Sequence, residues 1–279
     1  MKKTTWLKIG VSVLVTAILC LIAWSGILTG MDGSVSDLLF QRPGMTDGEI
    51  VVIGMDQRAV EELGPMPWPR DIMADVVACL NSDPDEKPAV IGIDVLYVGE
   101  SADPEADAYF AEIAAEGENV VVASAATFGN SIVDNGESFY LDERSVLYWD
   151  SPYPDLADVT DSGHINAMAD TDGIIRHALL YVDSPEGDRV YSFARVIYEH
   201  WCEENGTELN PLPETVDNGF FYLPYTARGG SYYENVSVID FLDGLVDPAD
   251  FAGKIVLIGP YAAGMRDEYR TAIDHAAPM

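Results

Sequence analysis

The stretch of residues 7–28 constrains this chain more than any other, because it decides on which side of a membrane the remainder lies. Its 22 residues include a single charge, Lys8. As a helix rising about 1.5 Å per residue it would span about 33 Å, which is enough to cross the hydrocarbon core of a bilayer. We therefore predict a transmembrane helix over residues 7–28.

The basic residues predict the orientation of that helix. Three lysines lie before it or at its start, and no basic residue follows until Arg42. Because cytoplasmic segments carry the excess of positive charge, residues 1–6 are expected in the cytoplasm and residues 29–279 outside it, anchored to the cell membrane. The alternative is a cleavable signal peptide, with Ala23-Trp24-Ser25 as an acceptable cleavage site. Both interpretations export the same region.

The exported region is strongly acidic. All 47 acidic residues lie after residue 28, together with only 12 of the 15 basic residues. A surface of that sign repels nucleic acid and anionic lipid, so nucleic acid is not an expected partner. The acidic residues are scattered, which is typical of the solvated surface of an exported protein. The length suits one large or two small domains, and we predict one, over residues 29–279.

Two exported cysteines, Cys79 and Cys202, lie on stretches with helical apolar spacing. They form either one disulfide or two buried free thiols, and nothing in the spacing brings the two stretches together. Neither has a partner at the short spacing of a zinc site, so the sequence predicts no metal site.

Apolar runs alternate with helical patterns in the first half of the exported region. The first run ends in Asp56 and the second contains Asp94. Helices are expected from about Asp71 and from Pro104, with Asp103 as the N-cap of the second. This alternation predicts an α/β fold with a mixed, mostly parallel central sheet and helices on both faces. The runs expected as strands cover residues 49–56, 89–97 and 119–124.

The second half gives shorter signals. Residues 163–182 are expected to form two strands joined by a tight turn at Asp172-Gly173, a pair that favours positive φ. Ser192 is expected to cap a helix whose apolar residues recur at i, i+3, i+4, i+7 and i+8. The other expected elements are short strands at 139–141, 146–149 and 220–225, a helix near 238–245 and an apolar strand at 253–259.

Five short motifs occur in a recognisable order. With them, the chain from about residue 33 onward resembles a CHASE-type extracellular sensor domain of the second class. That class is associated with adenylate or guanylate cyclases, histidine kinases and other signalling enzymes. The resemblance implies a non-catalytic α/β sensor outside the cell, with the enzyme in the cytoplasm. The motifs are Trp68-Pro-Arg70, Gly92-x-Asp94, His164-x-Asn166, Asp172-Gly-x-x-Arg176 and the Gly-Lys-Ile-Val-Leu-Ile-Gly strand at 253–259.

The end of the chain departs from that family. Thr271-Ala272 stands where the family usually has Thr-Pro, and the family's final helix and later membrane spans do not follow. An apolar last strand needs a covering element on each face. We therefore expect the parent reading frame to continue past Met279 with a helix that packs on the sheet, further spans and a cytoplasmic cyclase or kinase.

No enzyme motif is complete. Gly259 and Gly264 have the spacing of a phosphate-binding loop, but Met265-Arg266 replaces its Lys-Ser/Thr pair. No Gly-x-Ser-x-Gly turn occurs, and His164, the best candidate for a base, has no recognisable partner. A histidine satisfied by hydrogen bonds at a strand end is its alternative interpretation. The sequence therefore predicts no catalytic residue and no cofactor for this chain.

Polar residues near the ends of the predicted strands make up the candidate site. In parallel α/β sheets, ligands bind in the crevice at the carboxyl ends of the strands. An unidentified small-molecule or ionic ligand there would shift the domain between two arrangements. The candidate residues are Asp56, Trp68, Arg70, Asp94, His164, Asp172, Arg176 and Asp267.

Several alternatives stay open at this point. The candidate residues could simply hold loops together, and Asp56 and Asp94 could act as an acid–base pair or form an ion pair with Arg70. The protein could instead be an anchored or secreted hydrolase or a solute-binding protein. The sequence also leaves open whether the domain forms a homodimer.

Overall fold

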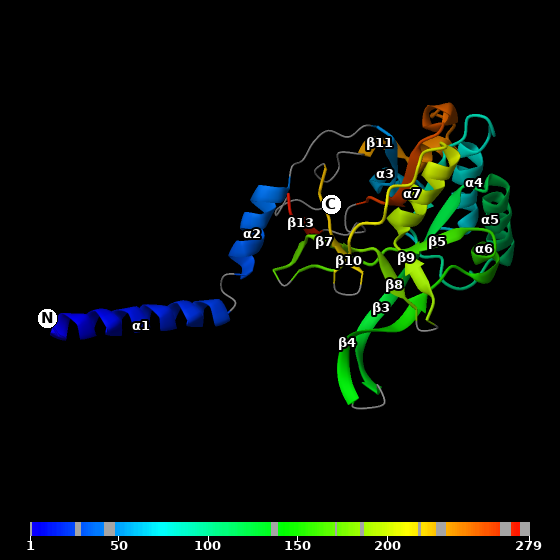
Figure 1. The fold of residues 1–279 in the computed structure, drawn as a ribbon. Coiled ribbons are helices and arrows are strands. Elements are labelled where there is room, and N and C mark those ends of the chain that lie inside the picture. The colour runs from blue at the N-terminus through cyan, green and yellow to red at the C-terminus, as the bar shows by residue number, and fades with distance from the viewer. Residues whose placement is uncertain are drawn as a thin grey trace.

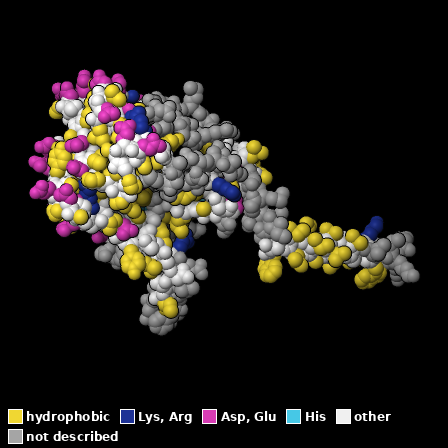
Figure 2. All heavy atoms as spheres, turned by 180° about the vertical axis from the view of Figure 1, so that it is seen from behind, with side chains coloured by type: hydrophobic (Ala, Val, Ile, Leu, Met, Phe, Trp, Pro, Cys, Tyr) yellow, Lys and Arg dark blue, Asp and Glu magenta, His cyan; other side chains and the backbone are white. Residues whose placement is uncertain are grey.

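A computed structural model describes residues 2–25, 29–41, 48–134, 139–170, 172–184, 187–216, 219–226, 233–262 and 269–273. Helix α1 (Lys2–Trp24) extends away from the rest of the chain, and α2 (Thr29–Phe40) lies against the globular part (Figure 1). Apolar side chains cover most of the part of α1 that is drawn in colour, whereas acidic side chains are scattered over the coloured part of the domain (Figure 2).

No helix within the described ranges combines the length and the hydropathy needed to cross a membrane. The predicted span over residues 7–28 is unconfirmed.

The domain is organised around one central sheet. Its strands run in the order β11-β1-β12-β2-β3, all parallel, and β5 pairs in parallel with the outer edge of β3. The mixed, mostly parallel sheet predicted from the sequence is confirmed. The strands are β1 (Ile50–Met55), β2 (Val90–Ile93), β3 (Val120–Asp134), β5 (Asp161–His164), β11 (Tyr233–Ser237) and β12 (Ile255–Pro260).

Helices pack on both faces of this sheet. The larger core lies under α4, α5 and α8, where the strands contribute fully buried residues such as Ile53, Ile91 and Ile258. On the opposite face α7 packs through Ile197 against Val90 and Val121. The helices are α3 (Gln57–Leu63), α4 (Arg70–Leu80), α5 (Pro104–Gly117), α6 (Pro154–Ala157), α7 (Phe193–Glu204) and α8 (Val238–Leu242), with a 3-10 turn η1 (Pro248–Phe251).

The α7 face leaves part of the sheet open. Helix α7 contacts β2, β3 and β5. Beside it, Ile50 and Val52 of β1 and Leu257 of β12 are only half-buried and line an apolar cavity of about 450 Å³.

Strand β3 is much longer than predicted. Beyond Ser124 it pairs in antiparallel fashion with β4 (Phe139–Asp150), and the resulting hairpin projects from the body of the domain (Figure 1). The two short strands expected at 139–141 and 146–149 are thus parts of one strand.

The hairpin predicted over residues 163–182 is wrong, although its turn is present. Gly173 has φ +81° and donates to the carbonyl oxygen of Asp170 over 2.8 Å. The chain before the turn pairs elsewhere, because β5 and the hydrogen bonds between Asn166 and Ala126 continue along β3. The following strands pair as β6 (Ile174–Ile175) with β13 (Arg270–Thr271), β7 (His177–Leu179) with β10 (Phe220–Tyr222), and β8 (Tyr181–Asp183) with β9 (Arg189–Tyr191).

The cysteines are free thiols, so the disulfide alternative is excluded. Cys202 is buried in α7 and Cys79 is half-buried in α4.

Candidate functional site

A proline-rich turn lies at the carboxyl ends of β1 and β2. It joins α3 to α4 over residues 64–69, and Trp68 is fixed there by a hydrogen bond of 2.8 Å from Nε1 to the carbonyl oxygen of Gly64. Arg70 follows as the first residue of α4 and is 8% exposed. The turn therefore places a buried arginine at the N-terminal end of α4.

Arg70 forms a buried ion pair with Asp107 of α5. Nη1 lies 2.8 Å from Oδ1, and the two side chains are 9% and 5% exposed. These two atoms are not aligned for a hydrogen bond, but Nη2 donates to the carbonyl oxygen of Gly99 over 2.6 Å, and the guanidinium lies 4.1 Å from the ring centroid of Tyr153. Burial raises the pKa of Asp107, but hydrogen bonds from Ser101 and the Arg70 charge outweigh it, so the pKa is lowered. Asp107, which was not a candidate, is thus the partner of Arg70.

A cavity of about 560 Å³ borders this ion pair. Its walls are mostly apolar and include Met55 at the end of β1, Trp68 from the turn, and Val95 and Tyr97 after β2. A cavity therefore lies at the carboxyl ends of the strands, with Trp68 and Arg70 in its wall, and its use as a ligand site stays a prediction. Asp56 and Asp94 are not among its lining residues.

Asp56 and Asp94 have separate surroundings. Asp56 is the N-cap of α3, where Oδ1 accepts from the backbone N–H of Ala59 and from Oγ of Ser237, each over 2.9 Å. Asp94 is exposed and borders the apolar cavity on the α7 face. Among the described residues, the cavity that Asp94 lines does not include Asp56.

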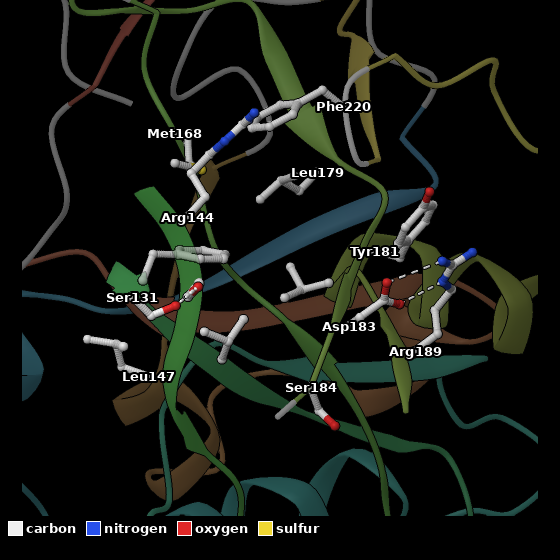
Figure 3. A pocket seen from close by; sticks show the side chains of 14 residues that line it. Ser131, Arg144, Leu147, Met168, Leu179, Tyr181, Asp183, Ser184, Arg189 and Phe220 are labelled. Carbon is white, nitrogen blue, oxygen red and sulfur yellow. Dashed lines mark hydrogen bonds and ion pairs between the residues drawn. The ribbon is translucent and has the colours of Figure 1, made fainter. Parts of the chain in front are cut away.

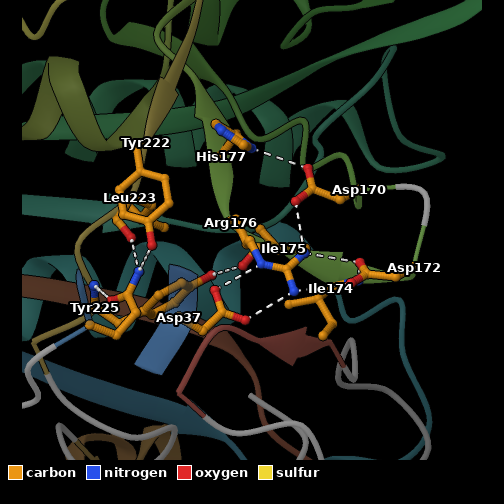
Figure 4. Close-up of polar contacts among 11 residues, drawn as sticks. Asp37, Asp170, Asp172, Ile174, Ile175, Arg176, His177, Tyr222, Leu223 and Tyr225 are labelled. Atoms are coloured by element: carbon orange, nitrogen blue, oxygen red, sulfur yellow. Dashed lines mark hydrogen bonds and ion pairs between the residues drawn. The ribbon is translucent and has the colours of Figure 1, made fainter. Parts of the chain in front are cut away.

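Arg176 is the centre of a second polar cluster (Figure 4). It is 5% exposed, and its guanidinium contacts three carboxylates, those of Asp37, Asp170 and Asp172, at 2.8–3.0 Å. Asp170 also contacts Nδ1 of His177 at 3.1 Å. Hydrogen bonds to Asp37 and Asp172 raise the pKa of Arg176, and the hydrogen bond from Arg176 lowers the pKa of Asp172. The predicted candidates Asp172 and Arg176 are thus in direct contact.

This cluster fastens α2 to the domain. Asp37 belongs to α2 and accepts from Nε and Nη2 of Arg176 through its two oxygens, over 2.8 and 2.9 Å. Gly33, one turn earlier, leaves room for the guanidinium, because a Cβ there would lie 2.9 Å from Nη2. Gln41, directly after α2, donates to the hydroxyl of Tyr222 and to the carbonyl of Leu223. We call these contacts, made by Asp37, Gln41, Arg176, Tyr222 and Leu223, the α2 clamp.

His164 is buried in the core at the end of β5. It is 2% exposed, and neither ring nitrogen has a hydrogen-bond partner among the described residues. Its partner in the strand register is Ser124, whose buried hydroxyl is also unpartnered. Burial lowers the pKa of His164 to about 4. The hydrogen-bonded histidine considered from the sequence is therefore not what the structure shows, and His164 stays neutral near pH 7.

The remaining candidate, Asp267, lies outside the described residues. Asp37, Gln41 and Asp107 were missed, although each makes a buried or half-buried polar contact. The placed residues include no group of three or more His, Cys, Asp or Glu side chains that could hold a metal ion.

The profile of the CHASE2 domain matches residues 13–279. The chain belongs to the CHASE2 domain family. This match confirms the resemblance predicted from the five motifs. CHASE2 domains are extracellular sensory domains, which is consistent with a sensory role for this domain. No curated protein and no solved structure matches the chain.

Proposed function

We propose that this CHASE2 domain is the extracytoplasmic ligand-sensing part of a membrane-bound signalling protein. The output is a cytoplasmic adenylate or guanylate cyclase or a protein kinase, and the domain itself has no catalytic activity. Ligand binding favours one of two arrangements of the domain, and the change in arrangement is transmitted to the helix that anchors the domain.

The α2 clamp is the observation that carries this proposal. A two-oxygen contact between a buried carboxylate and a guanidinium is directional as well as strong, so it fixes the orientation of α2 on the domain. Helix α2 follows α1 after a few residues. A movement of Arg176 is therefore passed to Asp37 and on to α1.

The surface of α1 supports a membrane anchor. Its large apolar side chains are exposed on every side of the helix, including Ile9, Val11, Leu14 and Leu19, which are 49–61% exposed. We propose that residues 7–28 lie in the bilayer with residues 1–6 in the cytoplasm.

The candidate acid–base residues support a non-catalytic role. His164 is enclosed in the core without a partner, and Asp56 is engaged in capping α3. A general base must reach the proton that it abstracts, and a side chain that is 2% exposed does not reach a substrate.

Topology and turnover test the proposal. In a chain without native cysteines, Tyr148→Cys places a thiol at a position that is 69% exposed on the projecting hairpin. We expect it to react with an impermeant thiol reagent in whole cells, whereas Thr4→Cys reacts only after lysis. The reverse pattern would overturn the topology. Turnover of ester, glycoside or phosphate substrates that is lost in His164→Gln or Asp94→Asn would favour a hydrolase instead.

A further inference from the structure

A second cavity, of about 630 Å³, lies beneath the projecting hairpin. One wall comes from β3 and β4, and the other from β7, β8, β9 and β10, so segments far apart in the chain enclose it (Figure 3). Its volume falls within the range of small-molecule sites in proteins.

Part of the inner surface of this cavity is apolar. Leu179 and Val182 are almost fully buried, and Phe128, Met168 and Phe220 pack against the same small core. Such a surface binds the hydrocarbon or aromatic part of a ligand.

The charged residues of the cavity are Arg144, Asp183 and Arg189. Arg189 lies 3.6 Å from the Tyr181 ring centroid and pairs with Asp183, with Nε 2.9 Å from Oδ1. Arg144 is exposed and extends toward Phe220, with its guanidinium carbon 5.4 Å from the ring centroid (Figure 3).

The net charge of these three side chains is one positive, in a chain with a net charge of −32. The other two cavities described above have the opposite sign. The crevice near Arg70 also contains Glu100 and Asp103, and the cavity on the α7 face contains Asp94. A cavity lined by guanidinium groups favours anions, whereas the acidic surface of the rest of the domain repels them.

We propose that the cavity beneath the hairpin binds a small monoanion with an apolar body, such as an aryl-substituted or alkyl carboxylate. Its carboxylate lies at Arg144, and its body contacts Leu179 and Phe220. This inference rests on the proposed sensing function and names the ligand class and its route to α2.

The route follows the two-stranded sheet of β7 and β10. Leu179 and Phe220 are register partners at the cavity end, and two residues further along, His177 is paired with Tyr222. Tyr222 belongs to the α2 clamp, and Arg176 directly precedes β7. A ligand that displaces the first pair therefore moves both attachment points of α2. The helices that border the crevice near Arg70, α4 and its neighbour α5, lie on the side of the domain away from α2 (Figure 1).

Calorimetry with three probes of matched shape tests the ligand class. The full chain in nanodiscs of neutral lipid is titrated with 4-phenylbutyrate, 4-phenylbutanamide and 4-phenylbutylamine. We expect the carboxylate to bind about tenfold or more tightly than the neutral amide, because hydrogen bonds to charged groups are the stronger ones, and the amine to bind most weakly. Equal affinities for the three probes, or no binding of the carboxylate at millimolar concentration, would overturn the proposal.

Variants locate the site. Arg144→Gln should weaken 4-phenylbutyrate about tenfold and leave the amide unchanged. The matched control is Arg58→Gln, because Arg58 is also exposed but lies on α3, outside the cavity. Equal losses in the two variants would mean that the anion responds only to the overall charge, and the proposal would be wrong.

Hydrogen exchange tests the route to α2. Binding of 4-phenylbutyrate should change amide exchange in residues 29–41 and leave residues 104–117 of α5 unchanged. Binding without any change in residues 29–41 would contradict the coupling. The labelling and turnover experiments address the sensor proposal separately, so failure of the two proposals can be told apart.

Discussion

The Arg70–Asp107 pair gives a stability prediction that follows directly from burial. Arg70→Met keeps much of the side-chain volume but leaves the Asp107 carboxylate, which is 5% exposed, without its cation. Removing one member of a buried pair costs about 3–5 kcal/mol, because the remaining charge is neither hydrated nor neutralised. The hydrogen bond from the backbone N–H of Ser101 remains, at 2.7 Å, so we expect the lower end, about 3 kcal/mol.

Urea unfolding of the full chain in mild detergent measures this loss. Tryptophan fluorescence, to which Trp68 contributes as one of five tryptophans, and far-ultraviolet circular dichroism both follow the transition. The matched control is Arg189→Met, whose ion-pair partner Asp183 is 56% exposed and which should change stability little.

A double variant separates the stranded charge from lost packing. Arg70→Met with Asp107→Leu removes both charges, and we expect it to recover at least about 2 kcal/mol of the loss. A loss below about 1 kcal/mol in Arg70→Met alone would refute the reasoning, because it would mean that water reaches the carboxylate.

The other predictions concern α2, acid stability and α7. Arg176→Met should increase amide exchange of residues 29–41, whereas Arg189→Met, at an exposed pair, should not. His164 has its pKa lowered to about 4 from an ordinary 6.5, so the unfolded chain binds its proton first. Stability should be complete above pH 6.5 and fall by about 3 kcal/mol as the pH drops to 4. His164→Gln should flatten that part of the urea-unfolding profile, while the control His200→Gln retains it. Gly163→Ala places a Cβ 2.4 Å from Cα of Phe193, so we expect at least about 2 kcal/mol of destabilisation in the same unfolding assay.

The strands of the sheet could be predicted because strands that are buried on both faces consist of nearly continuous apolar residues. Residues 50–55, 90–93 and 255–258 are apolar on both faces, and only strands covered on both faces need that composition. Asp103 and Pro104 marked the start of α5 for an equally local reason. In each case the neighbouring residues contain the whole signal.

The extension of β3 could not be predicted in the same way. Beyond Ser124 the strand leaves the main core, with Ala126 and Phe128 in the small core beneath the hairpin and Ile132 76% exposed, so no continuous apolar run marks it. The turn of the predicted 163–182 hairpin was correct, but the pairing of its strands was wrong. The residues before the turn pair with the edge of β3, which is distant in sequence and leaves no local signal.

The partners of the two buried arginines could not be predicted either. Asp107 and Asp37 are two of 47 acidic residues, and only the packing of α5 and α2 selects them. The short spacing from Asp172 to Arg176 was a usable signal, since the predicted turn at Asp172-Gly173 brings residues on its two sides together.

The half-buried apolar side chains beside α7 have a practical consequence for anyone purifying this domain. Ile50, Val52 and Leu257 line an apolar cavity in the native state. Dyes such as anilinonaphthalene sulfonate fluoresce on apolar surface of this kind, and their binding is commonly taken as a sign of a molten globule. For this protein a bright dye signal at neutral pH would be compatible with correct folding. Near-ultraviolet circular dichroism, which reports fixed packing of aromatic side chains, is the better measure of whether a preparation is native.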